Sequence, residues 1–260
     1  MKKQVGISNR TLGKHVLLNK ITGREAGIMA RKCPSFMKKQ YTFLDLCAGD
    51  GISSYASKTS SPEIIAKHHK FMKNYGINSN VILVEREEYN HARLKEQNYD
   101  ANILNCDAKE ITSIPNLHED SAMFIHADPN HIEDWPLAKE LLINSPKYTT
   151  MLATLGCNVG GLKRLPLDKR IKWYERMDEI LDWMPSRHDA LLVSLRGDKA
   201  QWAYLIIGPK AWHDQGIYIK DALKSFNYWK EGIDLIQFKT QKSNFYKERD
   251  RLFLTAKELA

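Results

Sequence analysis

The segment FLDLCAGDGISS, residues 43–54, constrains the fold more than any other part of the chain. An apolar run with an acid, Asp45, leads into two closely spaced glycines, Gly49 and Gly51. Glycine lets the backbone turn tightly and lets another group approach it closely. The segment therefore predicts a buried strand that ends in a turn. Three uses of the turn are open at this point: a nucleotide cradle, a pocket for another small ligand, or only a tight bend.

After this turn, short apolar runs alternate with longer amphipathic ones, which is typical of strand–helix–strand units. The predicted strands are 41–46, 81–85, 101–107, 121–129, 148–156, 189–197 and 201–209, and the predicted helices are 61–76, 87–97, 135–146 and 167–185. The link between the last two strands is too short for a crossover helix, so these strands form an antiparallel hairpin. We expect an α/β fold with a Rossmann-like, doubly wound, mostly parallel seven-stranded sheet that ends in this hairpin.

Positive charge is concentrated ahead of the glycine turn. Residues 1–40 hold ten lysines and arginines but one acid, Glu25, in a chain whose net charge is +8. Such segments often contact nucleic-acid phosphates, although a solvated tail is the other interpretation. We therefore expect a basic N-terminal extension at 1–40, one domain at 41–237 and a C-terminal segment at 238–260.

The rest of the composition indicates a protein of the cell interior. No apolar run approaches the roughly 18 residues that span a bilayer, and the N-terminus lacks the apolar core of a signal peptide. The four cysteines are scattered without a C-x-x-C pair, which fits a reducing compartment and argues against a zinc ribbon or a disulfide framework. We expect a cytoplasmic protein that does not bind membranes.

The glycine turn departs from the two familiar phosphate-binding motifs. A dinucleotide fingerprint G-x-G-x-x-G would place a third glycine where Ser54 stands, and a P-loop would require G-K-[ST]. The remaining candidate ligand for this turn is a nucleoside that carries no pyrophosphate. Acids near the ends of three later strands, at Glu85, Asp107 and Asp128, would converge with Asp45 on one crevice, because parallel strands end at the same edge of a sheet.

With these residues in view, the chain resembles the class I S-adenosylmethionine-dependent methyltransferases, from about Tyr41 to Pro209. DLCAGDG resembles motif I of that family, VEREE its ribose-binding acid, CDA its adenine-contacting acid, and ADPN its motif IV. The resemblance implies S-adenosylmethionine as the cofactor and a methyltransferase domain at 41–237. The cofactor-binding residues that it implies are Asp45, Cys47, Ala48, Gly49, Gly51, Glu85, Asp107 and Ala108.

The spacing between motif I and the ribose acid is unusual for this family. Asp45 and Glu85 lie 40 residues apart, about twice the family's usual separation. We interpret the excess as a first helix that begins near Ser53 and is extended or broken around Ser60–Pro62. The alternative ribose acid is Glu63, but nothing strand-like precedes it.

Motif IV indicates the acceptor. In amino-directed DNA and RNA methyltransferases it reads [DNS]-P-P-[YFW] and holds the target amine of a flipped base. Asp128 and Pro129 match this pattern, Asn130 replaces the second proline, and His131 stands in place of the aromatic residue. We take these four as the catalytic residues, with transfer to an exocyclic base amine, adenine N6 favoured, and with DNA or RNA bound through the basic N-terminal segment.

Other interpretations are weighed against this one. A cytosine-C5 enzyme needs a Pro-Cys nucleophile, whereas this chain has only the reversed pair Cys33-Pro34. A zinc site at His126, Asp128 and His131 competes with a packed, hydrogen-bonded His126, and we predict no metal. Two other classes stay open: a nucleic-acid-binding protein without catalysis, and a methyltransferase for a small molecule or a protein.

The chain also resembles the three-Cys-motif partner proteins, a bacterial methyltransferase-like family. DLCAGDG followed by SSPEIIA, the Asp-Pro ending of strand four, and GGLKRL after strand five carry this resemblance, which would explain the long gap. The loop that contains Lys163 and Arg164 is predicted either to bind substrate or to be a flexible surface loop. Trp202 and Tyr204 on the hairpin are predicted to be core residues.

Overall fold

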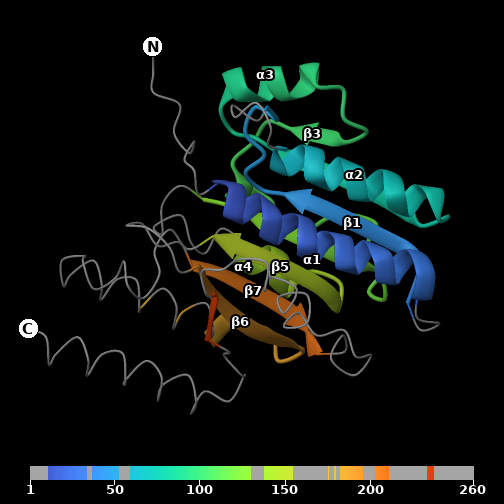
Figure 1. Ribbon diagram of the computed structural model, residues 1–260, viewed down its shortest axis with the longest axis vertical. Helices are drawn as coiled ribbons and strands as arrows, with labels where there is room; N and C mark the ends of the chain where they lie inside the picture. The colour runs from blue at the N-terminus through green and yellow to red at the C-terminus, as the bar shows by residue number, and fades with distance from the viewer. Residues whose placement is uncertain are drawn as a thin grey trace, which may run out of the picture.

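The computed structural model describes residues 11–33, 37–52, 59–129, 138–154, 175, 179, 182–195, 203–210 and 233–236. In this part of the chain, one eight-stranded sheet has the order β3-β2-β1-β4-β5-β7-β6-β8 (Figure 1). Its strands are β1 (Gln40–Asp45), β2 (Asn78–Val84), β3 (Asn102–Leu104), β4 (Ala122–Ala127), β5 (Tyr148–Thr154), β6 (His188–Leu195), β7 (Ala203–Pro209) and β8 (Ile233–Ile236). The helices are α1 (Thr11–Lys32), α2 (Ser61–Asn74), α3 (Glu88–Glu96), the 3-10 helix η1 (Ala108–Glu110) and α4 (Lys139–Ile143).

Five strands form the parallel part of the sheet. β1 runs parallel to β2 on one side and to β4 on the other, β2 is parallel to β3, and β4 is parallel to β5. Every residue of β4 and β5 is buried, as expected for strands that are covered on both faces. The continuous apolar runs of the sequence therefore predicted these central strands correctly.

The other end of the sheet is antiparallel. β7 lies between β5 and β6 and runs antiparallel to both, so the predicted hairpin is confirmed. The predicted number of seven strands is one too few, because β8 pairs antiparallel with β6 at the edge. β8 has only four residues, IDLI, and an acid interrupts its apolar pattern. So short a run carries little periodic signal.

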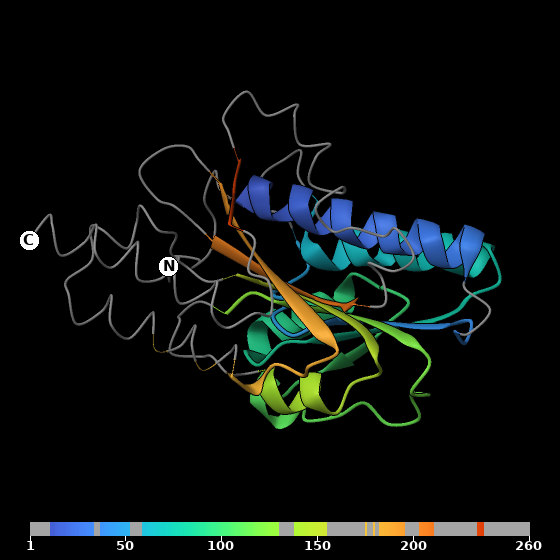
Figure 2. The same ribbon diagram turned by 90° about the horizontal axis from the view of Figure 1, so that it is seen from below.

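The two faces of the sheet bury different side chains. Phe43 and Phe124 belong to the core cluster shared with α1 and α2, whereas Leu44 and Ile125 belong to the cluster shared with α4. This alternation follows from the two-residue period of a strand. Figure 2 shows α1 and α2 side by side over one face of the sheet, with α4 against the other face.

Helix α1 lies within the segment that the sequence marks as a basic extension. Its residues Leu17, Leu18, Ile21 and Met29 are buried and belong to the same core cluster as β1. They recur at helical spacing, so α1 presents one apolar stripe to the sheet and to α2. Helix α1, which forms much of the basic segment, is therefore packed against the sheet and is not a separate tail.

The connection between the glycine turn and α2 is held by Ser60. Its hydroxyl accepts from the Glu63 amide at 3.3 Å as the N-cap and donates to the Gly51 carbonyl at 2.7 Å. The helix begins at Ser61, with Pro62 in its first turn, which confirms the predicted start at residue 61. A start near Ser53 falls on residues 53–58, outside the described residues.

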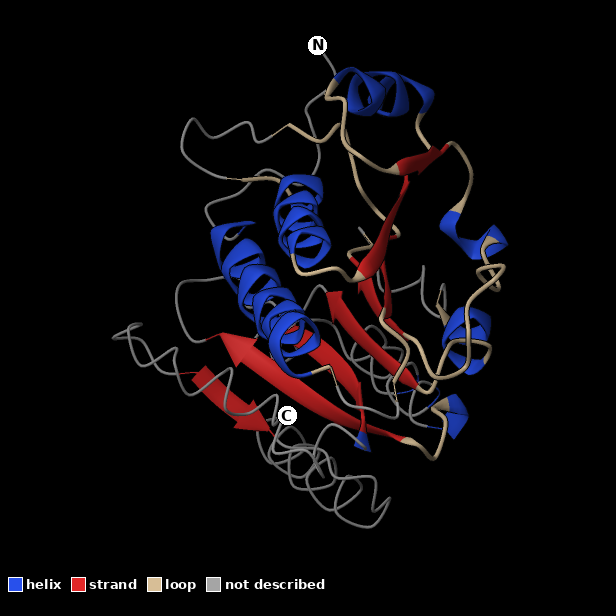
Figure 3. Ribbon diagram, turned by 90° about the vertical axis from the view of Figure 1, so that its right-hand side faces the viewer, coloured by secondary structure: helices blue, strands red, loops and turns tan. Residues whose placement is uncertain are grey.

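The remaining helices cover the opposite face of the sheet and its β3 edge (Figure 3). α3 confirms the helix predicted at 87–97, and α4 is a short helix within the predicted range 135–146. Most of the helix predicted at 167–185 lies outside the described residues. None of the described helices combines the length and the apolar character needed to cross a bilayer.

Candidate active site

The carboxyl ends of β1, β2 and β4 lie at one edge of the sheet. The chain order reverses at β1, with β2 and β3 on one side and β4 and β5 on the other. Asp45 ends β1, Glu85 directly follows β2, and Asp128 directly follows β4. In open parallel sheets, ligands bind at such a reversal point, outside the carboxyl ends of the strands. These three acids therefore surround the place where this fold can form a crevice.

The glycine turn at this edge requires its two glycines. Gly49 has φ +64° and Gly51 has φ +71°, a region that L side chains rarely adopt. A Cβ atom at Gly51 would lie 2.7 Å from Leu94 Cδ1, whereas one at Gly49 would meet no atom of the described residues within 4 Å. Gly51 thus permits close packing on α3, and no described side chain packs against Gly49.

Glu85 is fixed against this turn. Its Oε2 accepts from the Gly49 amide at 2.9 Å, and its Oε1 accepts from the Glu87 amide at 2.8 Å. A carboxylate has about four lone-pair positions, so further acceptor capacity remains after these two bonds. Asn105 adds support, because its side-chain amide donates to the Glu85 carbonyl at 2.9 Å. The acid is therefore oriented by the backbone and can still accept hydrogen bonds from a ligand.

Asp45 forms a buried pair that the sequence did not predict. Its Oδ1 lies 3.0 Å from His126 Nδ1 and accepts from the Cys47 amide at 3.2 Å. Burial lowers the pKa of His126, but the charge of Asp45 and its hydrogen bond outweigh this and raise the pKa overall. Asp45 Oδ2 is buried without a hydrogen-bond partner. Asp45 has no exposed surface and therefore positions the turn and the histidine.

Asp128 is paired with a residue from the first turn of α1. Lys14 Nζ lies 2.5 Å from Asp128 Oδ2, and the two side chains are 13% and 23% exposed. Burial raises the pKa of Asp128, but the charges of Lys14 and His126 and hydrogen bonds from Lys14 and Thr154 lower it overall. The carboxylate after β4 is thus ionised at neutral pH and lies at the edge of the candidate site.

Three further titratable groups near Asp128, on Cys47, Tyr204 and His15, are uncharged at neutral pH. Burial raises the pKa of the Cys47 thiol well above its usual range and also raises the pKa of the Tyr204 hydroxyl, with the charge of Asp128 adding to both. Burial lowers the pKa of His15 to about 4, and His15 Nδ1 is buried without a partner. Tyr204 is 1% exposed, which confirms its prediction as a core residue.

The adenine-contacting pair, Asp107 and Ala108, lies after β3. Asp107 Oδ1 accepts from the Lys109 amide at 3.0 Å and so caps η1, and its Oδ2 lies 3.5 Å from Arg86 Nη1. The Lys109 hydrogen bond is the main cause that lowers the pKa of Asp107. Asp107 is therefore the N-cap of η1. Its contact with an adenine stays a prediction.

The remaining predicted residues divide between the described and the undescribed parts of the chain. Pro129 is buried directly after Asp128, and Ala48 is buried, its amide donating to the Val84 carbonyl at 3.0 Å. Asn130, His131, Lys163 and Arg164 lie outside the described residues. The structure adds Lys14, His15 and His126 to the site. For the two α1 residues, the only sequence signal was their place in the basic segment.

The described residues contain no group of three or more His, Cys, Asp or Glu side chains placed to hold a metal ion. His126, one of the three ligands of the alternative zinc site, is 4% exposed and hydrogen-bonded to Asp45. The prediction of a packed, hydrogen-bonded His126 is therefore confirmed.

Comparisons with known proteins support the fold and do not extend to a family. No family model matches the chain, and no curated protein matches it. A crystal structure of protein LPL1258 from Legionella pneumophila, which carries the family label DUF519, is similar with a TM-score of 0.56 and 11% identity, over 89% of this chain and 98% of that one. Weaker similarities include cofactor-bound Rv0187 from MTB, with a TM-score of 0.47, 13% identity and coverage of 80% and 83%. An O-methyltransferase from Bacillus cereus in complex with SAH has a TM-score of 0.45, 13% identity and coverage of 80% and 84%.

At this level of identity, the similarity to LPL1258 shows a shared fold and nothing about chemistry. The described sheet is the Rossmann-like, mostly parallel sheet with an antiparallel hairpin that the sequence predicted. A shared fold can host unrelated activities, so function has to be argued from the side chains at the strand ends.

Proposed function

We propose that this protein is an S-adenosylmethionine-dependent methyltransferase that acts on an exocyclic amine of a nucleic-acid base, with adenine N6 as the favoured position. The observation that carries this proposal is the arrangement at one sheet edge of a glycine turn, an oriented acid and an ionised carboxylate. Gly49 is bonded to Glu85 at 2.9 Å, and Asp128 follows the strand next to β1.

The residues after β1 and β2 fit a nucleoside cofactor. Among the described residues no side chain packs against Gly49, so that a ligand could lie against its backbone, and Glu85 retains acceptor capacity for the two hydroxyls of a ribose. Asp107 would lie toward the adenine, and Cys47 and Ala48 would line the turn. S-adenosylmethionine, when bound, supplies an activated methyl group on a sulfonium.

Asp128 is the residue that we assign to the acceptor. Its carboxylate is ionised, so it can accept a hydrogen bond from the target amine and hold the nitrogen lone pair in line with the methyl group. S-adenosylmethionine would supply the methyl carbon and would take back the carbon–sulfur electron pair as the amine nitrogen forms its bond. Asp128 would stabilise the positive charge that the nitrogen gains, until the amine proton passes to solvent.

Methyl transfer is tested with tritium-labelled S-adenosylmethionine and separate pools of DNA, RNA, protein and small-molecule extract. We expect label in nucleic acid, and we expect Asp128→Ala to abolish transfer while cofactor affinity measured by calorimetry stays nearly unchanged. Label confined to protein or to small molecules would overturn the base-amine assignment, and undiminished turnover of Asp128→Ala would overturn the role of that carboxylate.

The cofactor site is tested separately by Glu85→Ala. Loss of the ribose hydrogen bonds should weaken S-adenosylmethionine binding by about tenfold or more, because charge-assisted hydrogen bonds are among the stronger ones. Glu87→Ala is the matched control, because it removes the side chain of an acid two residues away and keeps the amide that bonds Glu85. Equal affinity of wild type and Glu85→Ala would place the ribose elsewhere.

A further inference from the structure

The helical layer formed by α1 and α2 is strongly basic. α1 holds five lysines and arginines and α2 holds three, against one acid in each helix. The acid of α1, Glu25, is buried, so Glu63 is the acid that these two helices expose. α3, by contrast, holds one arginine and one lysine against two acids. Positive charge is therefore concentrated on this layer and is not spread evenly over the helices.

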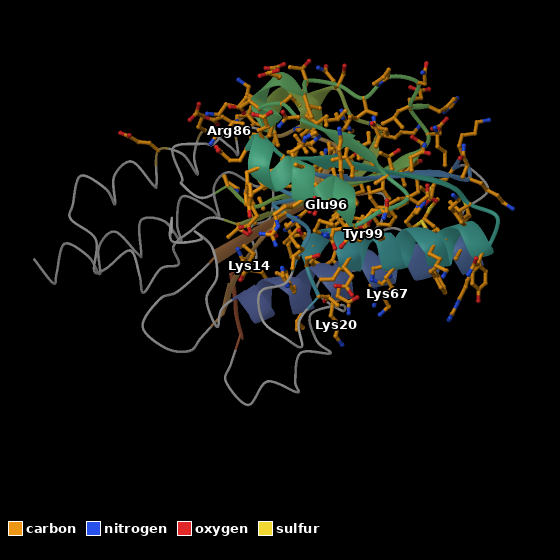
Figure 4. All side chains as sticks on the ribbon, turned by 90° about the horizontal axis from the view of Figure 1, so that it is seen from above. Lys14, Lys20, Lys67, Arg86, Glu96 and Tyr99 are labelled. Carbon is orange, nitrogen blue, oxygen red and sulfur yellow. The ribbon has the colours of Figure 1, made fainter. Side chains whose placement is uncertain are left out.

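Five of these cations lie on the side of the layer that faces away from the sheet. On α1, Lys20, Arg24 and Arg31 recur at intervals of four and seven residues, which places them on one helical face, opposite the buried stripe. On α2, Lys67 and Lys70 are three residues apart, and both are exposed. Figure 4 shows Lys20 and Lys67 on this outer side. We call Arg24, Arg31, Lys67 and Lys70 the α1–α2 basic face.

The two helices lie close enough for this face to be continuous. His68 Nε2 of α2 lies 2.8 Å from Asn19 Oδ1 of α1. A Cβ atom at Gly23 would lie 2.9 Å from His68 Cε1, so the lack of a side chain there lets the helices approach each other. Arg24 directly follows the glycine, and Lys67 directly precedes the histidine. The same contact therefore brings one cation from each helix together.

Acids of the described chain do not neutralise the basic face. Within the described residues, Arg31, Lys67 and Lys70 belong to no ion pair, and Arg24 Nε has no hydrogen-bond partner. Lys73, which lies outside this face, is instead bonded to an acid, Asp100, at 2.7 Å. Clustered cations that no acid compensates create a positive potential, which attracts anionic partners.

The position of the basic face relative to the candidate active site fits a long anion. Both helices begin at the carboxyl edge of the sheet, where Lys14 of α1 contacts Asp128 and the cap of α2 bonds the glycine turn at 2.7 Å. At 1.5 Å per helical residue, Arg24 and Arg31 lie about 15 Å and about 26 Å along α1 from Lys14. A small molecule held at Asp128 would not reach these cations. A strand of nucleic acid carries a charge on every unit and can span this distance.

We propose that the α1–α2 basic face binds the phosphate backbone of a nucleic acid whose base enters the candidate active site. The interface thus extends beyond the basic N-terminal segment, because Lys67 and Lys70 of α2 belong to it as well. The choice of a nucleic acid among polyanions rests on the proposed function. Phosphate contacts carry no base identity, so the face contributes affinity and orientation, and the recognised base is selected at the strand ends.

The test measures how binding depends on salt. Fluorescence anisotropy of fluorescein-labelled DNA and RNA oligonucleotides, without S-adenosylmethionine, gives the affinity of the full-length protein at several salt concentrations. Each phosphate contact contributes about 0.9 to the slope of log affinity against log salt for duplex DNA, and about 0.7 for single strands. We expect Lys67→Gln and Lys70→Gln each to reduce the slope by about this amount, and the double variant by about twice as much, for every sequence alike.

Lys95→Gln is the matched control, because it removes an exposed lysine from α3 and should leave the slope unchanged. Thermal unfolding of each variant confirms that it is folded. An unchanged slope in the double variant, or an equal reduction in Lys95→Gln, would overturn the proposal. Tighter binding to vesicles that contain phosphatidylserine than to the oligonucleotides would also overturn it, because the face would then serve a membrane surface.

These outcomes are distinct from those that test the proposed function. A slope that falls as expected in the double variant, while no acceptor is methylated, would overturn the proposed function and leave the interface standing. A base amine that is methylated, with a slope that does not change in the double variant, would overturn the interface and leave the proposed function standing.

Discussion

Glu25 gives the sharpest prediction about how α1 is joined to the sheet. It is the single acid of the basic segment, it is 5% exposed, and its Oε2 accepts from the Tyr41 hydroxyl of β1 at 2.5 Å. Burial raises its pKa from 4.5 to about 7, despite hydrogen bonding that lowers it. Between pH 4.5 and about pH 7, Glu25 therefore keeps its proton in the native state and loses it in the unfolded chain.

The sign of the effect follows from this difference. The stabilisation from protonated Glu25 is complete below the unfolded pKa of 4.5 and is lost as the pH rises through about 7. The full loss corresponds to about 3 kcal/mol, at roughly 1.4 kcal/mol for each pKa unit. Glu25→Gln keeps the size of the side chain and a carbonyl oxygen for Tyr41 but cannot ionise. The free energy of unfolding of the variant, relative to that of the wild type, should therefore increase by about 3 kcal/mol as the pH rises.

Urea unfolding of the full-length wild type and of Glu25→Gln, from about pH 5 to about pH 8, measures this gain directly. The difference between the free energies of unfolding of the two proteins at each pH cancels the contribution of every titratable group that they share. Glu96→Gln on α3 is the control, because Glu96 is exposed and should give no such dependence on pH. A difference between wild type and Glu25→Gln that stays constant with pH would show that Glu25 is not buried against β1.

Two further predictions concern the site itself. Gly51→Ala should lower the free energy of unfolding by about 2 kcal/mol or more, because of the left-handed backbone and the close contact with Leu94. Gly49→Ala should lower it by about 1 kcal/mol and should mainly reduce the affinity for the cofactor. Chemical unfolding measures the stability of each variant, and calorimetry measures its affinity. His126→Ala should lower the free energy of unfolding by about 3 kcal/mol or more, because it leaves Asp45 buried without its histidine partner, and a much smaller loss would show that this pair contributes little to stability. Because the folded pKa of His126 is raised, the wild-type advantage over His126→Ala should be complete below about pH 6.5 and decline as the pH rises through that folded value.

The parallel strands and the glycine turn could be predicted because their signals are local. Continuous apolar runs mark buried strands, and Gly49 and Gly51 mark a turn at the end of one of them. The pairing of Asp45 with His126 is not local, but it follows from register, because the two residues face each other across β1 and β4. Aligning the two predicted strands in parallel would have found it.

The role of α1 could not be predicted in the same way. Leu17, Ile21 and Met29 give the segment apolar residues that can pack, but its excess of lysines and arginines equally fits a solvated tail, and the sequence does not decide between the two. The contact between Lys14 and Asp128 depends on how α1 lies across the ends of the strands, and no pattern within either segment specifies that placement. Tertiary packing decided both features.

The atom that receives the methyl group decides whether this protein modifies a base amine. The full-length protein is incubated with methyl-labelled S-adenosylmethionine and either RNA or DNA, and the nucleic acid is then digested to nucleosides and separated by mass. We expect label on N6-methyladenosine or its deoxy form with the wild type, and none with Asp128→Ala. A wild-type protein that binds S-adenosylmethionine and leaves every base amine unlabelled would contradict it.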